Sequence, residues 1–175
     1  MTIEEMIRKY DIVIVEKDGE KKLAIRNVTG VKRDGMFDEI KANKESIIAS
    51  IEEEQKKKIE AFRVRQGKIN AIPGLKEIKE AKEKVEKFHI DFNRAMDRGD
   101  GILPVYPSVD VEALMEEYPQ AAAYIKAEKE SLCSNYELAE IGGKALERVI
   151  NGDWEKAIED MEKEISEFVE RHCWD

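Results

Sequence analysis

The feature that most constrains the fold is the spacing of apolar residues near the C-terminus. Intervals of four and three residues separate Trp154, Ile158, Met161, Ile165, Phe168 and His172. This spacing is typical of an α-helix that packs along one side against a neighbouring helix. A broken form of the same pattern covers 44–71, 75–98 and 119–150. The sequence therefore predicts a mainly α-helical fold.

Turn residues divide these helical patterns. The tripeptide Ile72-Pro73-Gly74 separates the patterns over 44–71 and 75–98, and so short a turn predicts an antiparallel helical hairpin. Pro104 and Pro107 then mark an extended crossover to the last part of the chain.

A pair of glycines, Gly142-Gly143, lies inside the helical pattern over 119–150. Each glycine costs a helix roughly 1 kcal/mol relative to alanine. We therefore expect this pair to mark a close helix crossing or a kink.

The first residues predict a small helix followed by a β-hairpin. Thr2 and Glu5 form a T-x-x-E capping box, which marks the start of a helix. Ile12–Val15 is a β-branched run that favours a strand, and Lys22–Val28 is the expected return strand. Between them, Asp18-Gly19 is a tight-hairpin signal.

A short helix with Phe37 and Ile40 facing inward completes this N-terminal part. The predicted organisation then has three parts. They are a small α+β segment at 1–50, a long antiparallel helical hairpin at 51–100 and an acidic helical bundle at 101–175.

Negative charge is concentrated in the last of these parts. Residues 1–100 carry 23 Lys and Arg against 21 Asp and Glu, a net charge of +2. Residues 101–175 carry 7 against 18, a net charge of −11, and the two sum to the −9 of the whole chain. A surface of this sign repels nucleic acid and membranes and attracts basic protein clefts. We therefore expect a protein partner, no direct DNA binding and no membrane.

The C-terminal helix carries much of this charge. Nine carboxylates lie between Asp153 and Asp175, about one per 4 Å of helix axis, whereas a DNA strand carries one phosphate per roughly 3.4 Å. Trp174 is an aromatic residue of the kind enriched in interface hot spots. The candidate partner-binding residues are Glu155, Glu159, Glu162, Glu164, Glu167, Glu170 and Trp174. An ordinary acidic surface helix, with Trp174 tucked under the bundle, is the alternative.

A basic cluster precedes the predicted turn at residue 72. It consists of Lys56, Lys57, Lys58, Arg63, Arg65 and Lys68. Because Glu52-Glu53-Glu54 comes directly before it, we interpret the cluster as part of a solvated charged face. Contact of residues 56–68 with RNA or DNA is the alternative.

Motifs of catalysis and metal binding are absent from the sequence. There is no Gly-rich phosphate loop, G-x-S-x-G, H-E-x-x-H or kinase pattern. Cys133 and Cys173 are far apart and predict free thiols in a reducing compartment. His172 and Cys173 are adjacent, as in some metal sites. A structural zinc needs four ligands at characteristic spacing, however, and His89 is the only other histidine in the sequence. We expect no catalytic residue, no cofactor and no metal.

The same sequence predicts a cytoplasmic protein. No stretch approaches the roughly 20 apolar residues that span a bilayer. The N-terminal residues contain no apolar segment after a basic start, so no secretory signal is visible.

The helix–hairpin–helix–helix order of the first 50 residues, ending in Lys44 and followed by Ile47-Ile48, resembles the TubC-type N-terminal docking domain. That family occurs at the start of assembly-line synthetases and in many phage proteins. The resemblance implies a homodimer and a hairpin edge that accepts a partner peptide as an added strand. Here that edge is Lys22–Val28. A hairpin that only caps the helical bundle is the alternative.

The whole chain, with its charged helices and its ending E-F-V-E-R-H-C-W-D, resembles small phage and mobile-element proteins of Gram-positive gut bacteria. Some of these are anti-CRISPR inhibitors of type II effector nucleases. Such nucleases hold nucleic acid in positively charged channels and read a short duplex motif with arginines. The resemblance therefore implies a non-enzymatic inhibitor in the cytoplasm of a bacterial host cell. Its acidic helix would bind a basic nucleic-acid-handling protein, such as a type II CRISPR effector nuclease with or without its guide RNA. An adaptor or structural phage protein that docks a peptide on the hairpin edge is the alternative.

Overall fold

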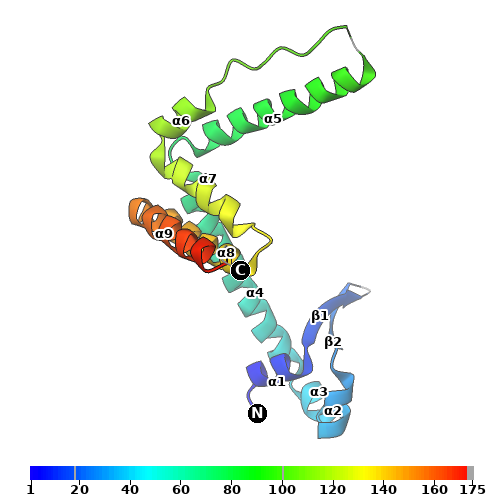
Figure 1. Cartoon of the computed structure of the whole chain (residues 1–175). Coiled ribbons are helices and arrows are strands. Elements are labelled where there is room, and N and C mark those ends of the chain that lie inside the picture. Colours follow the sequence, from blue (N-terminus) through cyan, green and yellow to red (C-terminus); the bar gives the residue numbers. More distant parts are fainter. Residues whose placement is uncertain (18, 100, 173–175) are drawn as a thin grey trace. The chain divides into compact units, whose positions relative to one another are not determined.

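Figure 1 shows a computed structural model of the chain, which describes residues 1–17, 19–99 and 101–172. Contacts between residues divide the chain into two compact units, Met1–Val64 and Arg65–Asp175. Most elements are helices, and the sheet among the described residues has two antiparallel strands near the N-terminus. The prediction of a mainly α-helical fold with a small N-terminal α+β part is confirmed. The three-part division of the chain stays a prediction.

The first unit is built around a capped helix and a hairpin. The capping box of Thr2 and Glu5 is present at the start of α1 (Ile3–Tyr10), which ends at Asp11 in a left-handed conformation with φ 48°. Strand β1 (Ile12–Lys17) pairs with β2 (Glu20–Ile25), and Ile14 lies opposite Leu23.

Three helices complete this unit, namely α2 (Val28–Asp34), α3 (Phe37–Ala42) and the first turns of α4 (Lys44–Asn70). Their apolar residues meet α1 and the hairpin in one core. Its buried members are Met6, Tyr10, Ile12, Val31, Ile40, Ile47 and Ile51. Each such side chain contributes about 1.5–3 kcal/mol when fully buried.

Two details expected for this unit are wrong. The return strand runs over Glu20–Ile25 and not Lys22–Val28, because Asn27 caps α2 through its side chain and Val28 is the first residue of that helix. Phe37 is exposed rather than inward, since the preceding Met36 packs against the core with Ile40.

The second unit contains α5 (Leu75–Arg98), α6 (Val111–Glu117), α7 (Pro119–Ser131), α8 (Tyr136–Ile150) and α9 (Trp154–His172). Helices α7, α8 and α9 pack against one another, and α5 packs against α6 and α7 (Figure 1). The main core of the unit joins residues from most of these helices. Its largest buried members are Ile69, Ile72, Leu75, Ile78, Tyr124, Val149 and Ile150.

The expected close helix crossing is present at Gly142. A Cβ atom added there would lie 2.3 Å from the backbone nitrogen of Ser131, so only glycine lets α8 approach the end of α7 this closely. A Cβ atom at Gly143 would meet no atom within 4 Å. The crossing therefore depends on the first glycine of the pair.

One expectation for this unit is wrong. The pattern over 119–150 is not one helix, because Asn135 caps the start of α8 with its side chain and separates it from α7. Within the unit, α5 packs against α6 and α7, and the antiparallel pairing of 44–71 with 75–98 stays a prediction. At the start of α5, the ring of Tyr118 packs directly on Gly74. A Cβ atom added at Gly74 would lie 2.0 Å from this ring, so a larger residue there would clash with it.

Candidate functional site

Helix α9 presents one apolar side to its own unit. Met161 and Phe168 are buried with relative exposures of 2% and 9%, and Ile158 and Ile165 pack against the core formed with α7 and α8. The predicted seam is therefore confirmed from Trp154 to Phe168, whereas His172 is exposed. The carboxylates between these positions turn outward, because residues of a helix advance by about 100° each.

All six candidate glutamates of α9 are exposed. The helical rotation of about 100° per residue places Glu155, Glu159, Glu162 and Glu170 within about 80° of one another on one side of the helix. We call these four residues the outer row. Glu164 and Glu167 lie on the opposite flank, so the structure does not bring all six together. Trp174 and Cys173 lie outside the described residues.

The outer row is largely without ion pairs. Within the part of the chain that the structure describes, Glu155, Glu159 and Glu170 form no ion pair, whereas Glu162 pairs with Lys126 of α7. On the opposite flank, the carboxylate of Glu167 lies 4.0 Å from the Lys163 ammonium. Three of the four outer-row carboxylates therefore have no ion-pair partner among the described residues.

Two other acids of the C-terminal segment have a structural role. Arg148 of α8 donates to Asp153 from Nε at 2.9 Å and from Nη2 at 2.8 Å, and to Asp160 from Nη1 at 2.7 Å. The hydrogen bond from this guanidinium lowers the pKa of Asp160, and the two carboxylates raise the pKa of Arg148. These acids hold α9 against α8.

A groove adjoins the outer row and was not predicted. It has a volume of about 700 Å³ and lies among α5, α6, α7 and α9. Its lining combines apolar side chains with acidic residues from α9 and lysines from α5 and α7. The residues are Lys82, Met115, Pro119, Ala122, Ala123, Ile125, Lys126, Lys129, Trp154, Glu155, Ile158, Glu159 and Glu162. The sequence contains no direct signal of this groove, because its lining residues come from four different helices.

Three of the six residues of the basic cluster at 56–68 form ion pairs with nearby carboxylates, and a fourth binds an amide. Lys57 and Lys58 pair with Glu53 and Glu54, one turn earlier on α4, at 2.7 and 2.9 Å. Arg65 and Lys68 bind the α8 side of the second unit, at Glu147 and Asn151, with distances of 2.8 and 2.7 Å. These contacts favour the interpretation as a solvated charged face.

The hairpin offers an edge for strand addition. Strands β1 and β2 pair only with each other among the described residues, so each leaves its outer edge without a strand neighbour. Leu23 and Ile25 of β2 pack against the core of the unit, and Lys21 pairs with Glu52 of α4. On β2 the edge available to a partner is that of Glu20–Ile25, and the outer edge of β1 is equally without a strand neighbour among the described residues.

No group of three or more His, Cys, Asp and Glu residues in the described ranges is arranged to hold a metal ion. Cys133 is a half-buried free thiol, and His172 stacks on Phe168 of its own helix with ring centroids 4.2 Å apart. Over the same ranges, no helix combines the length and the apolar character needed to cross a membrane. Comparisons of the chain with protein-family models, curated proteins and solved structures found no match.

Proposed function

We propose that this protein is a non-enzymatic inhibitor that binds a basic nucleic-acid-handling protein through the outer row of α9. The observation that carries this proposal is that Glu155, Glu159 and Glu170 lie exposed on one side of a packed helix and form no ion pair among the described residues. We propose a type II CRISPR effector nuclease in the bacterial cytoplasm as the target.

The physical basis is competition for cationic side chains. At a rise of about 1.5 Å per residue, successive members of the outer row lie about 6, 4.5 and 12 Å apart along the helix axis. A nuclease channel presents arginines and lysines to phosphates, and its reading of a short duplex motif depends on arginines. A fixed row of carboxylates on a helix competes for these groups without first having to be ordered.

The test uses a purified type II effector nuclease loaded with its guide RNA and measures cleavage of a target DNA duplex. We expect the wild-type protein to inhibit cleavage and the variant E155Q/E159Q/E162Q/E170Q to lose inhibition at least tenfold. The matched control E45Q/E52Q/E53Q/E54Q makes the same change in net charge on α4 and should retain inhibition. Full inhibition by the α9 variant contradicts the proposal.

A second candidate function rests on the free edge of β2. A partner peptide added as a third strand at Glu20–Ile25 would make the protein an adaptor or a structural phage protein. Substitution of Ile25 by proline removes a backbone donor of this strand and should abolish peptide docking while leaving acid-driven inhibition intact. Circular dichroism of the variant checks that the first unit still folds.

The homodimer implied by the resemblance is part of the proposal and has its own measurement. Sedimentation equilibrium should give about twice the chain mass of 20.2 kDa. A monomer at all accessible concentrations contradicts it without affecting the role of the outer row.

A further inference from the structure

The groove beside the outer row has the dimensions of a binding site. Its volume of about 700 Å³ lies within the range of about 300–1,000 Å³ that is typical of ligand sites. It is open to solvent along its length and is bounded by helices, with no sheet edge at its rim. An elongated occupant that contributes side chains therefore fits it better than an enclosed small molecule.

The floor of the groove is apolar. Met115 of α6, Ala122 and Ile125 of α7, and Trp154 and Ile158 of α9 line it, and each of these side chains is half-buried. Covering them completely would release water from apolar surface and so favour a complex. Apolar side chains repeated at i, i+3, i+4 and i+7 on a helix are a common complement to such a floor.

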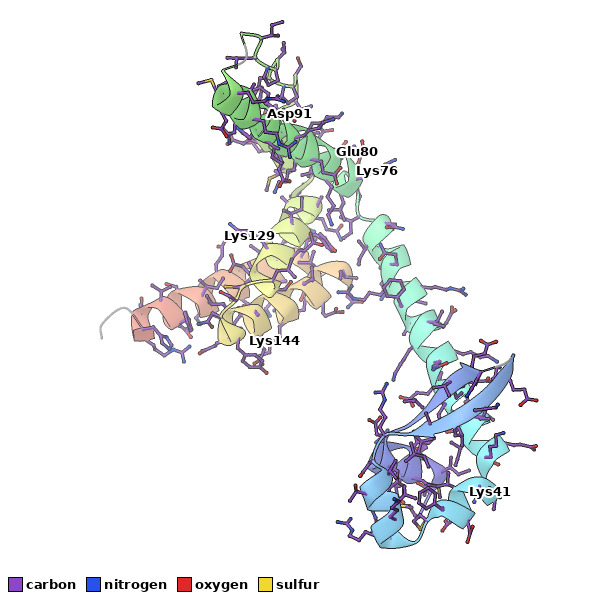
Figure 2. All side chains as sticks on the ribbon, turned by 90° about the vertical axis from the view of Figure 1, so that its right-hand side faces the viewer. Lys41, Lys76, Glu80, Asp91, Lys129 and Lys144 are labelled. Carbon is purple, nitrogen blue, oxygen red and sulfur yellow. The ribbon has the colours of Figure 1, made fainter. Side chains whose placement is uncertain are left out.

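The two walls of the groove carry opposite charges. Glu155, Glu159 and Glu162 stand along the α9 wall. Lys82 of α5 and two lysines of α7, Lys126 and Lys129, stand on the other side. Figure 2 shows Lys129 projecting from α7, whereas Lys144 projects from α8 on another side of the bundle.

One ion pair joins the walls, between Lys126 and Glu162. In the described part of the chain, Glu155 and Glu159 form no ion pair, and neither do Lys82 and Lys129. Along the α9 wall, the outer row continues beyond the groove in Glu170, and the segment 101–175 has a net charge of −11 (7 basic against 18 acidic residues). The acidic wall therefore dominates long-range attraction, while the lysine stems can move aside and cover apolar surface.

We propose that this groove is a docking site for a basic amphipathic α-helix of the partner protein. The apolar face of the partner helix packs on the floor of the groove. Its Lys or Arg residues lie against Glu155 and Glu159, and its other edge lies along Lys82 and Lys129. This inference rests on the proposed function, because it assigns part of the outer row to one wall of the site.

The probe is a fluorescein-labelled peptide of about 14 residues, or about 20 Å of helix, built only from Leu and Lys with Leu at helical spacing. Its binding to the full chain is followed by fluorescence anisotropy at low salt. We expect E155Q/E159Q to weaken binding about tenfold. The matched control E164Q/E167Q makes the same charge change on the opposite flank and should weaken it by less than about twofold.

A second pair of variants tests the floor without changing the acids. Substitution of Ala122 by Arg fills the groove with a long side chain on a half-buried helix position and should abolish peptide binding. Substitution of Ala122 by Ser keeps the position small and should preserve binding. Circular dichroism checks that the helices of both variants remain formed.

Three results overturn the docking site: equal weakening by the two glutamate pairs, unchanged binding by the Ala122→Arg variant, or equal binding of a peptide with Glu in place of Lys. Failure of the proposed function gives a different pattern. In that case the Leu–Lys peptide binds as expected, but the wild-type protein does not inhibit the nuclease. If the Ala122→Arg variant inhibits the nuclease as strongly as the wild-type protein does, the proposed function still holds. In that case the groove has no part in inhibition.

Discussion

Asp34 in the first unit and the outer row in the second unit have different surroundings. In the first unit, Asp34 accepts hydrogen bonds from Arg33 Nε at 2.9 Å and from the Tyr10 hydroxyl at 3.0 Å, and its carboxylate lies 2.8 Å from the Lys9 ammonium. These contacts hold its pKa far below the ordinary value. In the second unit, three members of the outer row on α9 have no ion-pair partner among the described residues.

The proposed function gives the same residue type two uses in this chain. Several acids of the first unit pair with nearby cations, as in the pairs Glu52–Lys21, Glu53–Lys57 and Glu54–Lys58. These charges act on the unit itself. Three members of the outer row have no ion-pair partner among the described residues, and an excess of charge on such a row would attract an oppositely charged partner.

The largest expected effect comes from disturbing the scaffold under the outer row. Substitution of Gly142 by Leu places side-chain atoms against the backbone of Ser131 and should lower the free energy of unfolding of the second unit by 3 kcal/mol or more, on the order of the largest core effects. Urea unfolding followed by circular dichroism measures it.

Gly143 provides the matched control for that substitution. Alanine there meets open space and should raise the free energy of unfolding by roughly 0.5–1 kcal/mol, because glycine is unfavourable inside a helix. Equal destabilisation at both positions contradicts the close crossing at Gly142.

The next effect concerns the salt dependence of partner binding. If uncompensated charge drives association, the affinity for the nuclease should fall by about tenfold to a hundredfold when ionic strength rises from about 0.05 to 0.5 M, as screening shortens the range of the attraction. The variant E155Q/E159Q/E162Q/E170Q should show a much flatter dependence. The α4 control E45Q/E52Q/E53Q/E54Q should keep the wild-type slope, and a flattened slope there breaks the comparison.

A smaller effect is expected inside the first unit. Substitution of Tyr10 by Phe removes the hydroxyl donor to Asp34 while keeping the fully buried ring, and should cost about 1 kcal/mol of stability. The same variant should leave inhibition unchanged. Weakened inhibition in a folded Tyr10→Phe protein would show that the first-unit charges also serve the partner.

The smallest effect is a pH dependence of stability with a defined sign. In an unfolded chain, an aspartate titrates at about 3.9. Because Arg33, Lys9 and Tyr10 lower the pKa of Asp34 in the folded state, its stabilisation is complete above that value and is lost as the pH falls below it. Asp160, whose pKa is lowered by Arg148, contributes with the same sign in the second unit.

Urea unfolding between about pH 5 and pH 2 tests this sign, since stability should decrease steadily toward acid. Asp34→Asn should reduce the slope for the first unit and Asp160→Asn that for the second. An unchanged slope in Asp34→Asn contradicts the assigned cause of its pKa shift.

The sequence predicted features that depend on neighbouring residues. The capping box at Thr2 and the α9 seam follow from spacing and residue type alone. The pair Gly142-Gly143 indicated a close crossing or a kink, and only the structure assigns a close approach to Gly142. The break between α7 and α8 was missed, although the capping residue Asn135 is a recognised start signal. The helical pattern on both sides continued across it and outweighed that signal.

Features that depend on tertiary packing could not be read in the same way. Asp160 differs from Glu155 in that it forms an ion pair, and its partner Arg148 belongs to another helix. The groove collects Lys82, Met115, Ala122 and Trp154 from four helices. No periodicity within one helix specifies which of its half-buried positions will face a gap between neighbours.

The central claim is that the outer row occupies a cationic nucleic-acid channel of the partner. The most direct measurement is a competition titration, in which this protein is added to a guide-loaded type II effector nuclease holding a fluorescent DNA duplex. We predict displacement of the duplex by the wild-type protein and not by E155Q/E159Q/E162Q/E170Q. A stable ternary complex of nuclease, duplex and wild-type protein would contradict the claim.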